Sequence, residues 1–534
     1  MNSTKRNLYS LIFLIGLFST STFSQKKALN SINENDLQSH LEFIASDILE
    51  GRETGKPGIE IAAKYLTSNL KKMNLTAIGE KNSYLQYIDL LHVQTDFENT
   101  FITINSVDGN IIFTNDSILN LNPTVEDLQL EGPIVFAGYG FVDSVNVYND
   151  FEGIDIKDKI IMIMSRTPEL VKNPISEDQQ PFQYIEFSKF QYAYKNGAKA
   201  ILWVFDPNNK YRSIYDLKEY LKYFQENYFL KENSNASLPF KIILITQYTA
   251  NQILKSMGHT LRNLQIKINS NNKPESFDLE RIKISLQIKK KVKEIKSPNV
   301  IGIVEGNDPI LKNEYIIYTA HYDHEGVNKN GEVFNGADDN GSGTVALLEI
   351  AEAFMNFPKK LKRSVVFAWM TAEEKGLFGS KYYASHPVFP LEKTIVCINL
   401  DMVGRVKTHA DTGKVLSFEI DVKDKDSLFV ISGHQSSELI KINEANCKKL
   451  QLLPDYDDDQ SILYQSDQYP FYQKGIPVLF YHTGIHSDLH TIHDEIGKID
   501  YTKMKRVAQL AFLVGYKVAC QSHKLVVDKP INKE

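Results

Sequence analysis

From residue 299 onward, short apolar runs alternate with stretches of helical periodicity, and this alternation restricts the possible folds more than any other feature. Runs such as VIGIVEG, EYIIYTA, SVVFAWMTA and TIVCINL are typical of buried strands. Helical patterns follow Gly343, run through FGSKYYAS, and end in the amphipathic stretch YTKMKRVAQLAFLVGYKVA. Strands that alternate with helices predict an α/β fold, with a mostly parallel mixed sheet flanked by helices.

The chain is too long for one core, because 534 residues correspond to about three average domains. Two helical patterns precede residue 73, and a second group of strands and helices begins near residue 123 with GPIVFAGYGF. The lysine-rich stretch IKKKVKEIKSPN marks a second boundary. We therefore expect a leader over 1–24, an N-terminal segment over 25–120, an inserted domain over 121–280 and a catalytic domain over 281–525.

The first residues match a secretory signal. Lys5 and Arg6 precede the apolar run LYSLIFLIGLF, and small residues precede a predicted cleavage site before Gln25. The run is shorter than the ~20 apolar residues that a membrane span needs, and no later segment reaches that length. We expect an exported protein, periplasmic or extracellular, whose mature chain has no membrane span.

Charge and cysteine content exclude other classes. The formal net charge of -6 gives no sign of the basic face that nucleic-acid binding requires. The three cysteines, Cys397, Cys447 and Cys520, are too few and too widely spaced for a disulfide framework, and Cys397 lies in an apolar run typical of a core. No feature indicates the oligomeric state.

Imidazole and carboxylate side chains follow the apolar runs at the predicted strand ends. HYDH begins at His321, Glu373 and Glu374 follow the third run, and Asp401 follows TIVCINL. The histidine-rich segment TGIHSDLHTIHDE follows the last run, and FNGADDNGSGT adds two adjacent aspartates before a helix. A single strand-end acid is more often a cap or a solvated group, but five such segments should meet at one edge of the sheet. Their side chains are those that bind one zinc ion or a pair.

A pair of metal ions explains the adjacent aspartates. A carboxylate such as Asp338 can bridge two cations, which would share a water molecule and lower its pKa. The other ligands would come from four residues: His321, Glu374, Asp401 and His490. Glu373 would remain free of metal to accept the water's proton, and Asp323 could orient His321. Magnesium or calcium is a weaker alternative, because histidines are interspersed among the acids.

The five motifs TAHYDH, NGADDNGSG, TAEEKGLFGS, NLDMVGR and GIHSDLHTIHD together resemble the co-catalytic dizinc exopeptidase family. This family includes bacterial leucyl aminopeptidases, with glutamate carboxypeptidases and, more distantly, glutaminyl cyclases as relatives. The resemblance implies the zinc-exopeptidase fold. LEFIASDILEGRETGKPGIEIAAKYL resembles the family's N-terminal segment, and the middle of the chain resembles an inserted β-rich α+β protease-associated domain.

The resemblance also implies roles for individual residues. His321 and Asp401 would bind one zinc ion, Glu374 and His490 the other, and Asp338 would bridge the two. Glu373 would be the general base, Asp323 would orient His321, and a cis peptide would join Asp338 to Asp339. The family's histidine-threonine pattern selects His490 from the four histidines of its segment. Gln468 stands where many relatives have histidine, which leaves the role of Asp467 open.

The resemblance therefore implies an exported zinc aminopeptidase that removes N-terminal residues from peptide substrates. A carboxypeptidase acting on acidic dipeptides is one alternative, and it would need an arginine in the pocket, for which Arg405 is the obvious candidate. A cyclase is a further alternative, and so is a non-catalytic binding protein. The intact glutamate pair and the complete ligand set count against the last of these.

Overall fold

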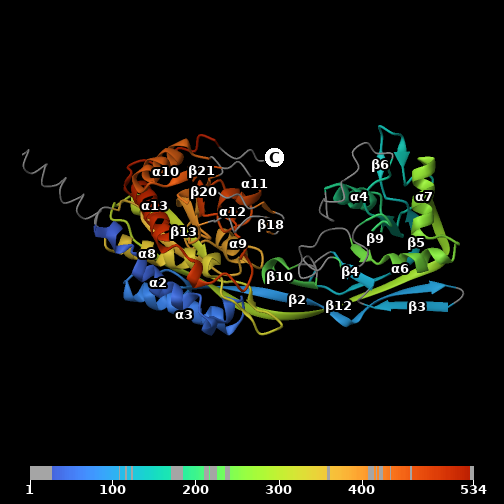
Figure 1. Ribbon diagram of the computed structural model, residues 1–534, viewed down its shortest axis with the longest axis horizontal. Helices are drawn as coiled ribbons and strands as arrows, with labels where there is room; N and C mark the ends of the chain where they lie inside the picture. The colour runs from blue at the N-terminus through green and yellow to red at the C-terminus, as the bar shows by residue number, and fades with distance from the viewer. Residues whose placement is uncertain are drawn as a thin grey trace, which may run out of the picture. The chain divides into compact units, whose positions relative to one another are not determined.

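The computed structural model describes residues 27–106, 109–114, 117–121, 124–169, 184–209, 216, 225–234, 241–357, 361–406, 414–415, 418–419, 425–432, 435–456 and 460–529 (Figure 1). The expected leader over 1–24 lies outside these residues. The chain divides into two compact units, one formed by Met1–Asp89 with Lys296–Glu534 and the other by Leu90–Ile295. The inserted unit Leu90–Ile295 contains the whole of the predicted inserted domain over 121–280. Strands β2 (Leu85–Ser106) and β12 (Ser276–Val304) continue through both boundaries, so no break in the sequence marks them.

The first unit contains a mixed sheet in the order β21-β20-β22-β17-β13-β16-β12. Its strands are β21 (Leu453–Asp455), β20 (Ser427–Ile431), β22 (Val478–His482), β17 (Thr394–Leu400), β13 (Tyr315–His321), β16 (Ser364–Met370) and the end of β12. The central strands β16, β13, β17 and β22 are parallel, and β12 and β20 join them antiparallel. This confirms the predicted α/β fold with a mostly parallel sheet.

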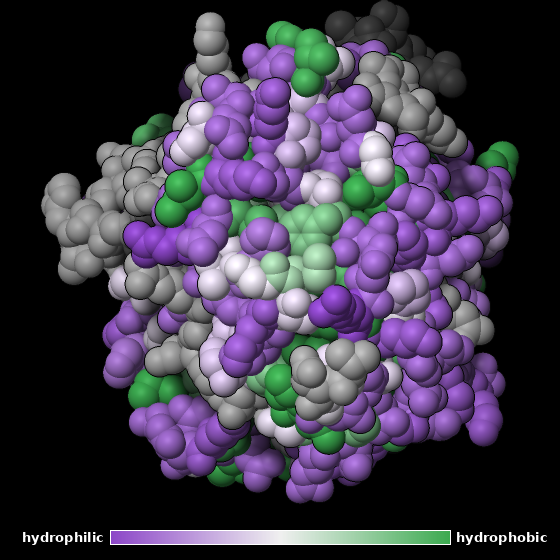
Figure 2. All heavy atoms as spheres, turned by 90° about the vertical axis from the view of Figure 1, so that its right-hand side faces the viewer, coloured by the Kyte–Doolittle hydropathy of each residue, from purple (hydrophilic) through white to green (hydrophobic). Residues whose placement is uncertain are grey.

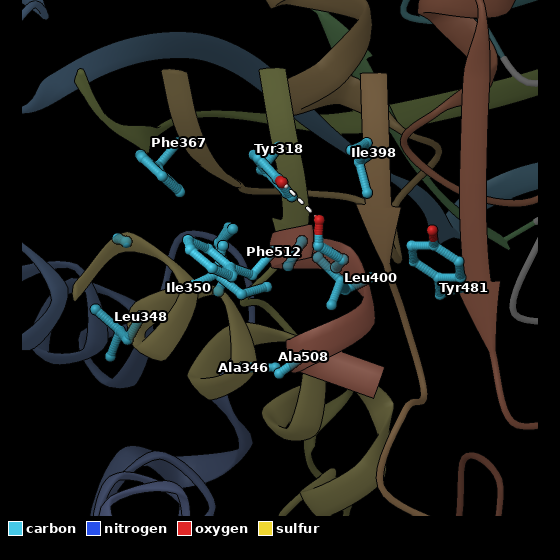
Figure 3. Packing of buried hydrophobic residues seen from close by; sticks show 14 of the residues in the cluster. Tyr318, Ala346, Leu348, Ile350, Phe367, Ile398, Leu400, Tyr481, Ala508 and Phe512 are labelled. Carbon is cyan, nitrogen blue, oxygen red and sulfur yellow. Dashed lines mark hydrogen bonds between the residues drawn. The ribbon is translucent and has the colours of Figure 1, made fainter. Parts of the chain in front are cut away.

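Helices cover one face of this sheet: α2 (Glu34–Ile44), α3 (Pro57–Lys72), α8 (Gly343–Met355), α10 (Ser437–Leu450) and α13 (Tyr501–Cys520). Figure 3 shows the strand residues Tyr318 and Phe367 facing Ile350 of α8 and Phe512 of α13. The Tyr318 hydroxyl donates a hydrogen bond to the Ala511 carbonyl at 2.7 Å, which satisfies the one polar atom that this side chain buries.

The alternate residues of the same strands point to the opposite face. There Ile317, Ala368 and Cys397 pack with Tyr383 of α9 (Phe378–Ser385) and Phe471 of α12 (Tyr469–Gln473). A sheet that is buried on both faces requires continuous apolar runs, which is the pattern of the sequence. Cys397 lies in the core as predicted, and all three cysteines are free thiols.

The inserted unit has its own parallel strands, β5 (Leu128–Ala137), β8 (Ile160–Met164), β9 (Ala200–Val204) and β11 (Ile242–Ile245). Short β4 (Ile118–Asn120) joins β11 antiparallel. Helices α6 (Gln247–Lys255) and α7 (Leu261–Asn271) pack on one face, and α4 (Tyr184–Lys195) packs on the other. Both faces of this sheet are therefore buried as well.

Hydrophilic side chains cover most of the face seen in Figure 2, and hydrophobic ones occur there in small separate groups. Scattered apolar residues of this kind are normal on a protein surface. Among the described residues, no helix is both long enough and apolar enough to cross a membrane.

Candidate metal centre

The carboxyl ends of the parallel strands bring together most of the predicted site residues. His321 is the last residue of β13, Glu373 and Glu374 follow β16, and Asp401 follows β17. His490 lies in the loop after β22. The turn Ala337–Ser342, which leads into α8, inserts its carboxylates among them. The predicted convergence at one edge of the sheet is what the fold produces.

Asp339 lies at the centre of this group, between two sets of side chains. Its Oδ1 is 3.3 Å from His321 Nε2, and its Oδ2 is 3.1 Å from His490 Nε2. His321 Nε2 is also 3.3 Å from Asp401 Oδ1, and His490 Nε2 is 3.2 Å from Glu374 Oε2. Oδ1 of Asp339 therefore faces the imidazole of His321 and, beyond it, Asp401. Oδ2 faces the imidazole of His490, with His324 Nδ1 at 3.6 Å, and Glu374 lies beyond them.

We predicted the bridging position for Asp338, and the structure does not put this carboxylate between the two sets. Asp338 Oδ1 accepts a hydrogen bond from the Gly404 N–H at 2.7 Å, and Oδ2 lies 3.3 Å from His486 Nε2. Asp338 thus faces the interior behind the site, and Asp339 faces the site. The cis peptide is likewise one position later than predicted, between Asp339 and Asn340.

Two side chains hold the turn that carries Asp339. The Asp494 carboxylate accepts hydrogen bonds from the backbone N–H groups of Asp338 and Asp339, at 3.0 and 2.9 Å. Asn340 donates from Nδ2 to the Leu400 carbonyl and accepts the Gly343 N–H at the start of α8. With both of its ends fixed, the turn presents the Asp339 carboxylate in one orientation.

The Asp323 carboxylate holds the glutamate pair more directly than it holds His321. It accepts the backbone N–H of Glu373 at 3.1 Å and that of Glu374 at 3.3 Å. His321 Nδ1 lies 3.2 Å from the backbone carbonyl of Asp323 and 3.8 Å from its carboxylate. Asp323 therefore orients His321 through its main chain, and its side chain fixes the loop that bears the two glutamates.

Three contacts at the site were not predicted. His324 Nδ1 lies 2.8 Å from Glu374 Oε1, and the Ser466 hydroxyl donates to Asp401 Oδ2 at 2.8 Å. Arg52 approaches from the N-terminal segment, far away in the sequence. The HYDH motif contains His324, but its spacing does not distinguish a ligand from a residue that orients one.

The remaining histidines of the segment after β22 lie elsewhere. His486 faces Asp338, His482 Nδ1 accepts the Gly484 N–H, and His493 is exposed. Gln468, found where histidine was expected, accepts from Asn399 and donates to the Leu463 carbonyl. Burial raises the pKa of the neighbouring Asp467 carboxyl to about 7.

The two adjacent glutamates have opposite electrostatic environments. Burial raises the pKa of Glu373 well above its usual range, and the nearby charges of Glu374 and Asp401 add to this shift. Burial also opposes ionisation of Glu374, but the charge of His490 and hydrogen bonds from His324 and His490 together outweigh it and lower the pKa. Hydrogen bonds from His321 and His490 likewise overcome burial and hold the pKa of Asp339 well below its usual range. Neighbouring carboxyl groups whose pKa values move apart are typical of a division between proton acceptor and anionic ligand.

The donor atoms fit a metal site. His321, Asp339 and Asp401 form one buried group whose ligand atoms lie within 4.8 Å of one another, and His324, Asp339 and Glu374 form another. Glu374 also belongs to a group with Glu325 and His490. Imidazole and carboxylate are the ligands that zinc accepts, and Asp339 belongs to two of the groups.

Comparison with known proteins identifies a family for the part of the chain that contains this site. Residues 299–514 match the model of peptidase family M28. The chain contains an M28 peptidase domain. This domain includes every predicted site residue, from His321 to His490, and confirms the family that the motifs resemble.

Curated relatives match the chain over a short stretch. "Leucine aminopeptidase 2" of Trichophyton rubrum is 39% identical over 107 residues, which cover 20% of this chain and 19% of that protein. "Aminopeptidase YwaD" of Bacillus subtilis is 39% identical over 110 residues, or 20% of this chain and 22% of that protein. The chain thus matches about a fifth of the length of these relatives.

A solved structure resembles the chain over nearly its whole length. The "Aminopeptidase from Aneurinibacillus sp. strain AM-1" covers 95% of this chain and 98% of its own, with a TM-score of 0.54 and 18% sequence identity. This likeness shows that the two chains share a fold.

Proposed function

We propose that this chain is an exported aminopeptidase that removes N-terminal residues from peptides and works with two zinc ions. One observation carries the proposal: the two oxygens of the Asp339 carboxylate face two separate imidazole–carboxylate sets. A carboxylate in this position is suited to bridge two cations. The M28 match over 299–514 supports the peptidase activity.

Each zinc ion would be held by one imidazole, one terminal carboxylate and one oxygen of Asp339. His321 and Asp401 would serve the first ion, and Glu374 and His490 the second. When bound, such a pair polarises the scissile carbonyl and lowers the pKa of water. His324, with Nδ1 at 2.8 Å from Glu374 Oε1, would orient that ligand.

Glu373 would act as the general base. Its raised pKa suits a group that takes up a proton, because an effective base has a pKa near the working pH. Glu373 Oε2 lies 4.0 Å from His321 Nε2, at the edge of the ligand set. The carboxylate would accept a proton from the attacking water and deliver it to the nitrogen of the leaving amine. The hydrogen bond from the Glu373 N–H to Asp323 would keep this carboxylate in place.

The carboxypeptidase alternative receives less support, because its candidate arginine is already engaged. Arg405 is 6% exposed, and its Nη1 donates to Asp488 Oδ2 at 3.0 Å. Asp488 in turn pairs with Lys498 at 2.9 Å. An arginine held in such a pair would have to give it up before it could bind the carboxylate of a substrate.

The proposal is tested with a defined peptide mixture in which each peptide is present in free and N-acetylated form. The mature, zinc-loaded protein is incubated with the mixture, and the products are followed by mass spectrometry. We expect stepwise loss of single N-terminal residues from the free peptides only. Loss from the C-terminus, cyclised N-terminal glutamine or unchanged peptides would contradict the aminopeptidase and point to the carboxypeptidase, the cyclase or the binding protein.

Export and the nature of the insertion belong to the same proposal. The basic, apolar and small-residue pattern of 1–24 supports export, and the motifs GPIVFAGYGF and NGAKAIL support a protease-associated domain within 90–295. N-terminal sequencing of protein recovered from the periplasm and the medium should begin at Gln25. A full-length chain confined to the cell interior would contradict export.

A further inference from the structure

The turn Arg52–Thr54 reaches the metal centre from outside the M28 match. Arg52 is completely buried and donates four hydrogen bonds, all to backbone carbonyls: Tyr322 at 2.9 Å, Ile44 at 2.6 Å, Asn335 at 2.7 Å and Gly336 at 3.0 Å. Tyr322 lies between His321 and Asp323, and Gly336 lies three residues before Asp339. One side chain thus ties together the two loops that carry the central ligands.

Arg52 does this without forming an ion pair with any residue that the structure describes. A buried guanidinium is normally neutralised by a direct carboxylate partner, and here carbonyl oxygens take its donors. Burial lowers the pKa of Arg52 only to about 10, because the charges of Asp339 and Asp323 oppose the shift. The positive charge therefore stabilises an acidic centre and leaves the carboxylate oxygens of its ligands available.

Thr54 acts on the other part of the centre. Its hydroxyl donates to Asp323 Oδ2 at 3.1 Å, and the same carboxylate accepts the N–H groups of Glu373 and Glu374. Thr54 is 2% exposed, so water has little access to take over this hydrogen bond. The Thr54 hydroxyl thereby fixes the Asp323 carboxylate, which in turn fixes the backbone of Glu373 and Glu374.

The backbone of the turn is built for close approach. Gly51 has a φ of +64°, and a Cβ there would lie 2.3 Å from the Gly326 carbonyl oxygen and 2.6 Å from that of Phe334. Arg52 itself has a φ of 50°, a left-handed conformation that is uncommon for a residue with a side chain. The turn is pressed against the loops after β13 and before Asp339, which is where positioning contacts must lie.

We propose that Arg52 and Thr54 are positioning residues of the metal centre: Arg52 fixes the loops bearing His321 and Asp339, and Thr54 fixes the Asp323 carboxylate that holds the glutamate pair. The inference rests on the proposed metal-dependent function. It predicts that the region matched by the M28 model is incomplete as a catalytic unit without the N-terminal segment.

Matched pairs of substitutions test the proposal in the full-length protein. Thr54→Val removes the hydroxyl that binds Asp323, and Thr67→Val on α3 removes a hydroxyl that makes no hydrogen bond among the described residues. Arg52→Lys is matched by Arg363→Lys, because Arg363 is also fully buried and donates to the carbonyls of Val518, Gln521 and His523. Arg363 differs in that its Nε also donates to Glu314 Oε2 at 2.8 Å. Comparison of Arg52→Lys with Arg363→Lys distinguishes a general loss of stability from a specific effect on the metal centre.

Three measurements are made on each variant: the thermal stability of the metal-free protein, the visible absorption and affinity of bound Co²⁺, and kcat and KM for a peptide. We expect Thr54→Val to lower kcat about 10-fold with KM within about twofold, as for loss of a residue that orients metal ligands. Arg52→Lys should change the Co²⁺ spectrum and weaken Co²⁺ binding at least 10-fold. Thr67→Val and Arg363→Lys should leave the spectrum and kcat as in the parent protein.

The outcomes separate this inference from the proposed function. Variants of Arg52 and Thr54 that lose only stability, with spectra and kcat equal to those of their controls, would overturn the positioning role. If the parent protein cleaves no peptide, the aminopeptidase fails, and the Co²⁺ spectra and affinities still decide the inference. If Arg52→Lys does not fold, the comparison of Thr54→Val with Thr67→Val decides it alone.

Discussion

Two groups of buried polar residues occupy the same position in the two units, beyond the carboxyl ends of parallel strands. In the inserted unit, Arg166 follows β8 and Asp206 follows β9. The Arg166 guanidinium donates to both oxygens of Asp206 at 2.6 and 2.7 Å. Ser165 and Gln265 donate to the same carboxylate at 2.9 and 2.8 Å. The Asn208 N–H adds a third at 3.0 Å, so Asp206 has a cation and three further donors.

The metal centre differs in the balance of its charges. Among the described residues, Asp339, Glu373 and Glu374 face imidazoles, and Asp401 faces His321 and the Ser466 hydroxyl. The Arg52 guanidinium donates to backbone carbonyls and not to these carboxylates. Among the described residues, some buried polar atoms there have no hydrogen-bond partner, one of which is His324 Nε2. Buried carboxylates require cations. A carboxylate paired with a guanidinium is thus typical of a structural cluster. An excess of buried carboxylates over cations is typical of a metal-binding site.

The largest expected effect separates proton transfer from metal binding. Glu373→Gln removes the proposed base but keeps the size of the side chain, so kcat should fall by about 10³. The zinc content, measured by elemental analysis, should stay at that of the parent protein. Near-normal turnover would remove Glu373 from the mechanism, and loss of zinc would make it a ligand.

The next prediction concerns the two adjacent aspartates. Asp339→Asn should lower the zinc content toward one ion or none, because an amide is a poor bridge between two cations. Asp338→Asn should retain the metal, because its side chain can still accept the Gly404 N–H. Equal metal loss in both variants would contradict the assignment of the bridge to Asp339.

An Asp→Asn substitution in the inserted unit should lower stability and leave the zinc content unchanged, which is the reverse of the result expected for Asp339→Asn. Asp206→Asn leaves the Arg166 guanidinium without its counter-charge, and the free energy of unfolding should fall by about 3 kcal/mol. Urea unfolding measures the loss, and the zinc content should not change. A stability equal to that of the parent protein would show that the Arg166–Asp206 pair does not stabilise the inserted unit.

The smallest effect concerns a buried acid outside both groups. Burial raises the pKa of Glu349 on α8 from 4.5 to about 8. The charges of Asp36 and Glu352 add to this shift, and His40 Nε2 lies 3.8 Å away. Because the folded-state pKa is raised, Glu349 should destabilise the fold progressively between pH 4.5 and about 8, by at most ~1.4 kcal/mol per pH unit.

Glu349→Gln should therefore increase thermal stability more at pH 8 than at pH 5. Glu60→Gln, at an exposed position in the first turn of α3, serves as the control for the loss of a carboxylate, because Glu60 is not among the charges that act on Glu349. A gain that is equal at both pH values would show that Glu349 does not titrate in this range.

The strands could be predicted from the sequence, because buried strands have continuous apolar runs. The residues at their ends could be predicted as well, because parallel strands have their carboxyl ends at the same edge of the sheet. The sequence could not distinguish Asp338 from Asp339 as the bridging residue. Both lie in an irregular turn, which has no regular periodicity from which to predict the direction of each side chain. Arg52 also left no signal, because its partners are backbone carbonyls that any residue could supply. The sequence has no break at the bounds of the unit Leu90–Ile295, because β2 and β12 run through them.

Anomalous diffraction at the zinc edge, from crystals of the mature protein, tests the central claim most directly. The account predicts two peaks on opposite sides of the Asp339 carboxylate, one against His321 and Asp401 and the other against Glu374 and His490. A single peak, or metal beside Asp338 instead, would contradict it.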